Sequence, residues 1–550
     1  MKKAALCLVA AALTAVCRLA LAAPEIIVVN GKVFTADAAK PAAQAIAVEH
    51  GRISAVGADE DVRALAGPAT RIVDAGGRRV VPGLTEAHVH LGSALPMFAP
   101  PVKPIAMPGL PFPGPTPEQA LQKVHEAAQD PGDWITAFIG PAVARDPRNW
   151  RAALDEAAGN RPTMLRGFWG HALLLNSAAM ARLGITDDVV DPLGGWWGRD
   201  DHGHLDGAAY ENAQYMGWSR VAPVVPQRLA QVLDDAASRY TRWGVTSIHL
   251  MNNGKTVEDT AQALSLMDLR QKWTVYAWGG DAPTIRAAWD EIASATRLPT
   301  RMRVDGPKWL LDGTPIEQLA FQREPYPGRG DWRGRHNFTE AQERDILRTA
   351  LSRPQQLILH VVGDGETDRL FNLMEAIAPA AEWAKKRVRL EHGDGIRPDT
   401  LARAARLGVV VTINPLHFIA PLADGRPPRP METLSPVRSL LKSGIRLAIG
   451  SDAGGDEVNP FLNMMLACTY AANPSEALTR EEALMAYTAG GAYVERQEAV
   501  RGRIAPGMAA DLAILSQDVL EVPLKMLPAT RSVFTLVDGE VAYEDREALR

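Results

Sequence analysis

The stretch of sequence that decides the fold is Pro82-Gly83-Leu84-Thr85-Glu86-Ala87-His88-Val89-His90. The residues after Gly83 predict a strand, and successive side chains of a strand point to opposite faces. His88 and His90 therefore project to the same side, where both imidazoles can bind one metal ion at the end of the strand. The pair alone does not decide between a metal site and two solvated histidines.

Three further polar residues follow apolar runs later in the chain. His360 ends the run Leu357-Ile358-Leu359, His392 ends residues 388–391, and Asp452 follows residues 448–451. Such runs alternate with helical stretches, which is typical of a parallel sheet wrapped by helices, most often a closed (β/α)8 barrel. The carboxyl ends of barrel strands converge on one mouth, so we expect these residues to meet the first two histidines there. Taken singly, each histidine could instead be a buried core residue.

Both ends of the chain read as short strands separated by turn residues, over residues 26–81 and 511–543. Neither end has enough strands to bury a face, so we expect one composite β-sandwich domain that brackets the barrel. The expected division is a signal peptide at 1–22, the N-terminal part of the small β domain at 23–83, the barrel with insertions at 84–495, and the C-terminal part of the small domain at 496–550.

The first residues are typical of a secretory signal peptide. Lys2 and Lys3 precede an apolar run over residues 4–16, and Ala20-Leu21-Ala22 supplies small residues for a peptidase. A membrane anchor is the alternative, but the apolar run is shorter than the roughly 20 residues that span a bilayer. We therefore expect cleavage after Ala22 and an exported protein, periplasmic or secreted, with no stable membrane association.

Composition narrows the function classes. Apolar residues make up 47% of the 550 residues and charged residues 22%, as in an average soluble globular protein. The formal net charge of −5 argues against a nucleic-acid partner. The chain has no Gly-x-Ser-x-Gly elbow and no glycine-rich phosphate loop, so serine hydrolysis and nucleotide chemistry lack support. The expected partner is a small-molecule substrate, and homo-oligomerisation stays open.

The chain resembles the amidohydrolase superfamily, specifically its YtcJ-like branch of metal-dependent hydrolases. The resemblance runs from about Ile26 to Tyr543 and rests on these motifs: Val80-Val81-Pro82-Gly83 with the histidine pair, Gly244-Val245-Thr246-Ser247, Lys308 to Gly313, His360-x-x-Gly363-Asp364, Glu391-His392, Gly450-Ser451-Asp452, and Gly502-Arg503-Ile504-Ala505-Pro506-Gly507-Met508-Ala509-Ala510-Asp511-Leu512.

The resemblance implies hydrolysis of a non-peptide C–N bond by a metal-activated water, with Asp452 as general base. It implies one or two divalent ions, with zinc expected: His88, His90 and Asp452 would hold one, His360 and His392 the second, and a carboxylated Lys308 would bridge them. A lysine that pairs with Asp305 or Asp312 is the alternative for Lys308. His171 and His417 also match the branch and could bind a substrate carbonyl, although each could be an ordinary loop residue.

The chain also departs from the branch. Glu86 replaces an aspartate before the histidine pair, and Ala453-Gly454-Gly455 follows Asp452 where an aromatic residue and a proline are common. The proline-rich residues 92–117 predict a stiff loop that covers the mouth. A catalytically silent periplasmic ligand-binding or regulatory protein on the same fold is the alternative function. All six ligand positions are filled, which favours an enzyme.

Overall fold

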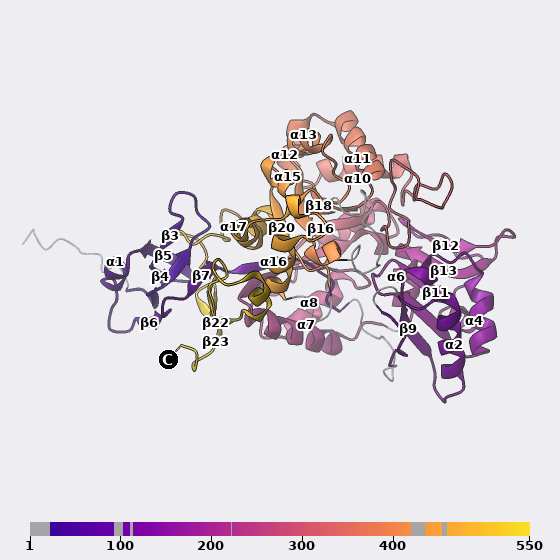
Figure 1. Ribbon diagram of the computed structural model, residues 1–550, viewed down its shortest axis with the longest axis horizontal. Coiled ribbons are helices and arrows are strands. Elements are labelled where there is room, and N and C mark those ends of the chain that lie inside the picture. Colours follow the sequence, from indigo (N-terminus) through magenta and orange to yellow (C-terminus); the bar gives the residue numbers. More distant parts are fainter. Residues whose placement is uncertain are drawn as a thin grey trace, which may run out of the picture.

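The computed structural model describes residues 23–92, 103–110, 114–221, 223–419, 435–453 and 459–549. Figure 1 shows three parts: sheets built from both chain ends on the left, a barrel in the middle, and an inserted sheet with its helices on the right. The expected signal peptide, residues 1–22, lies outside the described residues. Within the described ranges, no helix combines the length and apolar character needed to cross a membrane.

The middle part is a parallel eight-stranded barrel, as the sequence predicts. Each neighbouring pair in the strand order is parallel. The first and last strands meet through backbone hydrogen bonds from Asp452 N to His88 O (2.8 Å) and from His90 N to Ala453 O (3.3 Å). In spatial order the strands are β8 (Leu84–Val89), β14 (Val245–Met251), β15 (Lys272–Trp278), β16 (Met302–Leu310), β17 (Ile358–Val361), β18 (Arg389–His392), β19 (Val410–Ile413) and β20 (Leu447–Ile449).

Amphipathic helices cover the outside of the barrel. In α7 (Pro226–Thr241), for example, Leu229, Leu233 and Tyr240 recur at helical spacing and are buried against the strands. Several helices begin with a capping box, such as Thr339 with Gln342 at α10. The other helices that follow barrel strands are α8 (Val257–Ser265), α9 (Ile285–Ser294), α10 (Glu340–Leu351), α11 (Asp364–Ile377), α12 (Ala380–Lys386), α13 (Leu401–Leu407), α15 (Val437–Lys442), α16 (Pro460–Thr469), α17 (Arg480–Met485) and α18 (Gly491–Val494).

Two sheets at one end share a single apolar core. The first has the order β5-β4-β1-β6, and the second has the order β23-β22-β21-β7-β2-β3 and so joins strands from both chain ends. Side chains such as Val28, Val80 and Phe534 pack in one cluster between them. The strands are β1 (Ile26–Val29), β2 (Lys32–Phe34), β3 (Ala42–Ala43), β4 (Ala45–Glu49), β5 (Arg52–Gly57), β6 (Arg71–Asp74), β7 (Arg79–Pro82), β21 (Leu512–Leu515), β22 (Ser532–Val537) and β23 (Glu540–Glu544), with α1 (Asp59–Arg63) beside them.

The insertion between β8 and β14 forms a five-stranded mixed sheet with apolar clusters of its own, in the order β12-β13-β11-β10-β9. Its strands are β9 (Ile135–Ile139), β10 (Thr163–Gly167), β11 (Ala172–Leu175), β12 (Gly195–Arg199) and β13 (Leu205–Glu211). Its helices are α2 (Pro117–Ala128), α3 (Pro141–Ala144), α4 (Trp150–Ala158), α5 (Ser177–Arg182) and α6 (Asn212–Ser219).

The proline-rich segment is described only in part. Residues 93–102 and 111–113 lie outside the described residues, so the predicted cover over the mouth stays a prediction. Ile105 forms a parallel bridge with Ala137 of β9, and Met107 is buried against the same sheet. The described part of the segment therefore belongs to the inserted sheet.

Candidate metal centre

The six residues expected to bind metal lie at one end of the barrel. His88 lies on β8, Lys308 on β16, His360 on β17 and His392 on β18, while His90 and Asp452 follow the ends of β8 and β20. Carboxyl ends of parallel barrel strands share one rim, which explains how residues far apart in sequence meet.

The first group of side chains contains His88, His90 and Asp452. The Asp452 Oδ1 atom lies 3.1 Å from His88 Nε2 and 3.2 Å from His90 Nε2, and the two Nε2 atoms are 3.2 Å apart. The outer nitrogens have other partners: His88 Nδ1 bonds to Glu391 Oε2, and His90 Nδ1 lies 2.7 Å from Asn253 Oδ1. A carboxylate only accepts, so His88 carries its proton on Nδ1 and presents an Nε2 lone pair.

His360 and His392 form the second group, with His392 Nε2 2.9 Å from His360 Nδ1. Asn414 Nδ2 donates to Gly450 O, which turns Asn414 Oδ1 towards His392 Nδ1 at 2.8 Å. His360 Nε2 in turn lies 3.4 Å from Gly313 O. Both outer nitrogens therefore face acceptors, and the two inner nitrogens are left with lone pairs that face each other.

Lone pairs at such distances repel unless a cation or a proton lies between them. Burial lowers the pKa of His90 to about 4 and the pKa values of His360 and His392 well below the ordinary value, so these imidazoles are neutral. Neutral imidazoles with a carboxylate are the usual ligands of zinc and similar divalent ions. The donor set therefore fits a divalent metal.

Lys308 turns into this centre. Its Nζ lies 3.1 Å from His88 Nε2 and 5.2 Å from the centre of the Trp278 ring. The two aspartates considered as partners are engaged elsewhere: Asp305 pairs with Arg496 at 3.0 Å, and Asp312 accepts backbone N–H groups of Val362 and Gly363. Burial lowers the pKa of Lys308 to about 8, so a larger fraction of the amine is unprotonated than in an exposed lysine.

Backbone geometry holds the ends of β18 and β20 in unusual conformations. His392 has φ 75° and Asp452 has φ 53°, values that non-glycine residues adopt only when the surrounding structure imposes them. Glu86 Oε1 accepts the backbone N–H groups of His88 (3.1 Å) and Ser451 (2.8 Å). The glutamate that replaces an aspartate thus joins the first strand to the last.

His171 and His417, the two residues expected to contact substrate, both lie beside the centre. The ring of His171 is 5.2 Å from that of His360, and its Nδ1 lies 2.9 Å from Glu211 Oε2. Burial alone would lower the pKa of His171, but the charge of Glu211 outweighs it and raises the pKa to about 9. His417 Nε2 lies 3.2 Å from Asp452 Oδ2, so His417 could also contribute to the second group.

Sequence reasoning missed the residues that orient the imidazoles. Glu391 stands in a recognised motif but had no role assigned to it, and Asn414 lies three residues before His417. Asn253 and Glu211 carried no local signal. Glu211 is fully buried with φ 54°, a strained conformation at the point where the inserted sheet reaches the mouth. Such a residue can be identified only once its backbone and partners are known.

Comparison with known proteins agrees with the family that the sequence motifs indicate. A model of the amidohydrolase family matches residues 71–543. The chain is 28% identical to N-substituted formamide deformylase of Arthrobacter pascens, with 94% of this chain and 98% of that protein covered. It is 25% identical to YtcJ of Bacillus subtilis (strain 168), with 91% and 96% covered. A metal-dependent hydrolase structure from Pyrococcus horikoshii OT3 matches with a TM-score of 0.65 at 20% identity, covering 91% of this chain and 99% of that one.

Proposed function

This chain is a hydrolase of the amidohydrolase family, and we propose that it cleaves a non-peptide C–N bond with the help of one or two divalent ions, zinc being the expected metal. The observation that carries the proposal is that imidazole lone pairs and the Asp452 carboxylate gather in two adjacent groups at the barrel mouth. One relative of this chain is named as an N-substituted formamide deformylase, and this relationship supports amides as substrates.

Asp452 is proposed as the general base. Burial works against its ionisation, but the imidazoles of His88, His417 and His90 outweigh burial and hold the pKa of Asp452 well below its usual range. A divalent ion held by these residues would supply Lewis-acid chemistry, which lowers the pKa of water towards about 7. The ionised Asp452 then takes the proton from the attacking water and passes it to the departing nitrogen.

The histidines beside the centre are proposed to bind the substrate. His171, protonated beside Glu211, can donate a hydrogen bond to the carbonyl oxygen on which negative charge develops. His417 follows β19, the strand next to β20, and lies against Asp452, where it can hold the departing group.

Lys308 is proposed to carry a carboxylated amine. A lysine ammonium beside a dication is repelled, so a lysine in this place is neutral, modified or displaced. Its buried amine, with a pKa lowered to about 8, is suited to react with carbon dioxide. The unprotonated amine nitrogen would bond to the carbon of carbon dioxide and release a proton to solvent, which leaves a carbamate anion that could help to hold divalent ions. Lys308→Ala is then expected to lose the second ion and most activity, and normal metal content with a normal rate would contradict the bridging role.

The experiment that tests the proposed function combines metal analysis with assays. Purified protein is expected to contain one or two divalent ions per chain and to hydrolyse at least one member of a panel of N-substituted formamides, N-acyl amino acids and cyclic amides. A chelator should abolish turnover, and added zinc should restore it. Stable metal binding without turnover on any member would favour the silent ligand-binding alternative.

Export is proposed as well, on the Lys2-Lys3 start, the apolar run and the small residues at Ala20-Leu21-Ala22. Mass spectrometry of the protein from the cell envelope is expected to find a chain that begins near Ala23. A soluble product that retains Met1 would contradict export.

A further inference from the structure

A cavity lies at the joint between the inserted sheet and the barrel. It has a volume of about 470 Å³ and is lined by residues 191–195, which lead into β12, by Pro283 after β15, by residues 335–339, which precede α10, and by Gln342 within α10. Small-molecule sites in proteins have volumes of roughly 300–1,000 Å³. None of the six expected metal ligands, all of which the structure describes, lines this cavity. A molecule bound there would therefore occupy a site of its own.

Two opposite charges lie on the walls of the cavity, Asp191 on the side of the inserted sheet and Arg335 on the side of the barrel. Burial lowers the pKa of Arg335 and the charge of Asp191 opposes this effect, so the carboxylate is within electrostatic range of the guanidinium. The two groups are nevertheless too far apart to form an ion pair, and neither forms one with any other residue that the structure describes. A ligand with one anionic and one cationic group could satisfy both charges.

Both charged side chains are held in place by their neighbours. The Arg335 guanidinium lies 4.0 Å from the ring centre of Trp196, and the Trp196 ring is stacked on Tyr210 with an interplanar angle of 22°. Asp191 Oδ1 accepts the backbone N–H of Trp197 at 2.9 Å, which leaves Oδ2 for another donor. Groups that are already ordered lose less conformational entropy on binding than freely rotating surface side chains do.

The wall also has an apolar part, which consists of Pro192, Leu193, Pro283 and Phe338. An apolar group of a ligand would be removed from water against these side chains, and this burial favours binding. The cavity therefore matches a small molecule that combines two opposite charges with an apolar group.

The other polar side chains of the wall bond within the protein: His336 to Glu366, Asn337 to the Leu310 carbonyl, and Gln342 to Thr339. Burial lowers the pKa of His336 to about 4, so its ring is neutral at pH 7. The recognition of a charged ligand is therefore assigned to Asp191 and Arg335.

We propose that this cavity binds a zwitterionic α-amino acid with an apolar side chain, its carboxylate against Arg335 and its ammonium group against Asp191. The site is built from the inserted sheet and the barrel together, so its occupant would hold these two parts to each other. The proposal does not depend on the proposed function, because binding at this site requires neither the metal centre nor any reaction.

Isothermal titration calorimetry of the metal-loaded full chain at pH 7 tests the choice of ligand. The probe is phenylalanine, compared with 3-phenylpropanoate, which lacks the ammonium group, and with phenethylammonium, which lacks the carboxylate. Phenylalanine is expected to bind at least about tenfold more tightly than either, as for hydrogen bonds to charged groups. Equal affinity for all three compounds, or no binding of phenylalanine at millimolar concentrations, would overturn the proposal.

Variants locate the binding site, because an amino acid could also bind to metal ions at the centre. Asp191→Asn and Arg335→Gln each remove one charge, and each should weaken phenylalanine binding at least about tenfold. Asp188→Asn and Arg329→Gln are the matched controls, because both residues are exposed and neither lines the cavity, and they should bind like the wild type. Unchanged affinity in either Asp191→Asn or Arg335→Gln would contradict the assignment.

Hydrogen exchange locates the ligand without any variant. Amide exchange at residues 191–195 and 335–342 is expected to slow when phenylalanine is added to the wild type, because the ligand would hold these two segments together. Protection confined to the barrel mouth would show that the amino acid binds at the metal centre, and the proposal would then be wrong.

Discussion

At the scale of the residue, Asp452 joins both halves of the centre, since its two oxygens face different histidines. Asp452→Asn is expected to keep the fold and lower kcat by about 10²–10⁴, because an amide cannot take up the proton of water. Steady-state kinetics on any substrate found in the panel, with circular dichroism as the control for folding, checks this. Turnover close to that of the wild type would show that Asp452 is not the general base.

Glu391 orients the ring of His88 and is a positioning residue. It is fully buried, pairs with the equally buried Arg389, and accepts the Nδ1–H of His88. Although burial would raise the pKa of Glu391, the charge of Arg389 and the hydrogen bond from His88 lower it to about 2, so the carboxylate is ionised at neutral pH. Glu391→Gln is expected to weaken metal binding about 10- to 100-fold, as measured by competition with a chelating dye.

The same substitution leaves Arg389 as an unpaired buried charge, which costs about 3–5 kcal/mol of unfolding free energy. The double variant Glu391→Gln with Arg389→Met separates the two effects, because it removes both charges. Its stability should recover while its metal affinity stays low. Recovery of metal affinity in the double variant would show that Glu391 acts only through stability.

At the scale of the element, the barrel closes where β20 meets β8. Gly450 makes this possible, since a Cβ there would lie 2.3 Å from the His88 nitrogen and 2.5 Å from the His88 Cβ. Gly450→Ala is therefore expected to separate the two strands, to lower the unfolding free energy by about 1–3 kcal/mol, and to reduce metal content. Gly57→Ala on β5 is the control, because its added Cβ would meet only an ordinary contact at 3.4 Å. Equal stability of the two variants in denaturant titrations would contradict this account of barrel closure.

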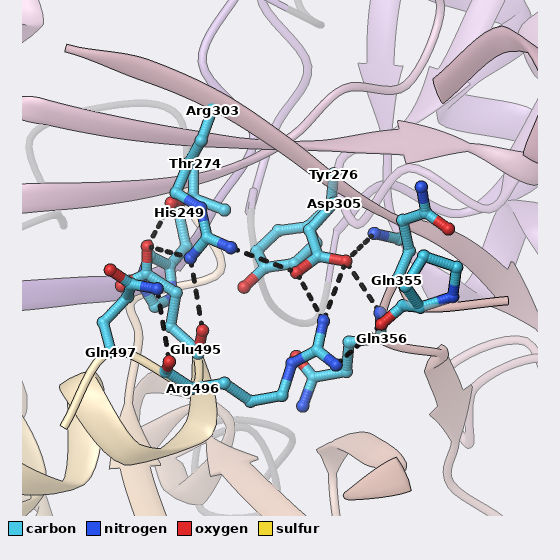
Figure 2. A network of polar contacts seen from close by, with 12 residues as sticks. His249, Thr274, Tyr276, Arg303, Asp305, Gln355, Gln356, Glu495, Arg496 and Gln497 are labelled. Atoms are coloured by element: carbon cyan, nitrogen blue, oxygen red, sulfur yellow. Dashed lines mark hydrogen bonds and ion pairs between the residues drawn. The ribbon is translucent and has the colours of Figure 1, made fainter. Parts of the chain in front are cut away.

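At the scale of the whole molecule, a polar network holds residues 495–501, which connect the barrel to the terminal sheets. Figure 2 shows Glu495 among His249, Thr274 and Arg303, with Arg496 turned towards Asp305. Glu495 Oε2 lies 3.0 Å from His249 Nε2, and Glu495 also pairs with the buried Arg501. These contacts join the C-terminal segment to the interior of β14, β15 and β16.

Removing this carboxylate should therefore destabilise the protein. Glu495→Gln is expected to lower the unfolding free energy by about 3–5 kcal/mol, because Arg501 would stay buried without its partner. Glu498→Gln breaks a pair with Arg387 nearer the surface, where Glu498 is 36% exposed, and should cost about 0–1 kcal/mol. Urea titrations of both variants measure the difference. If Glu495→Gln lowers the unfolding free energy no more than Glu498→Gln does, the network does not hold the C-terminal segment to the barrel.

The sequence by itself determined the barrel and the family, because apolar strands that end in polar residues are a local pattern and the motifs are contiguous. It also predicted that His88, His90, His360, His392 and Asp452 meet at one mouth, since the carboxyl ends of parallel barrel strands share one rim. Lys308 was expected only from the resemblance to the family. The expectation of sheets built from both chain ends rested on the same kind of local pattern.

Only the tertiary structure decided which nitrogen of each histidine faces the centre. That choice depends on Glu391, Asn253 and Asn414, and the partner of His88 is 303 residues away in sequence. The buried His249 carried no signal either, because a single histidine in an apolar strand looks the same whether it is structural or functional. Pairings between distant strands and loops arise from packing, and no local pattern in the chain records them.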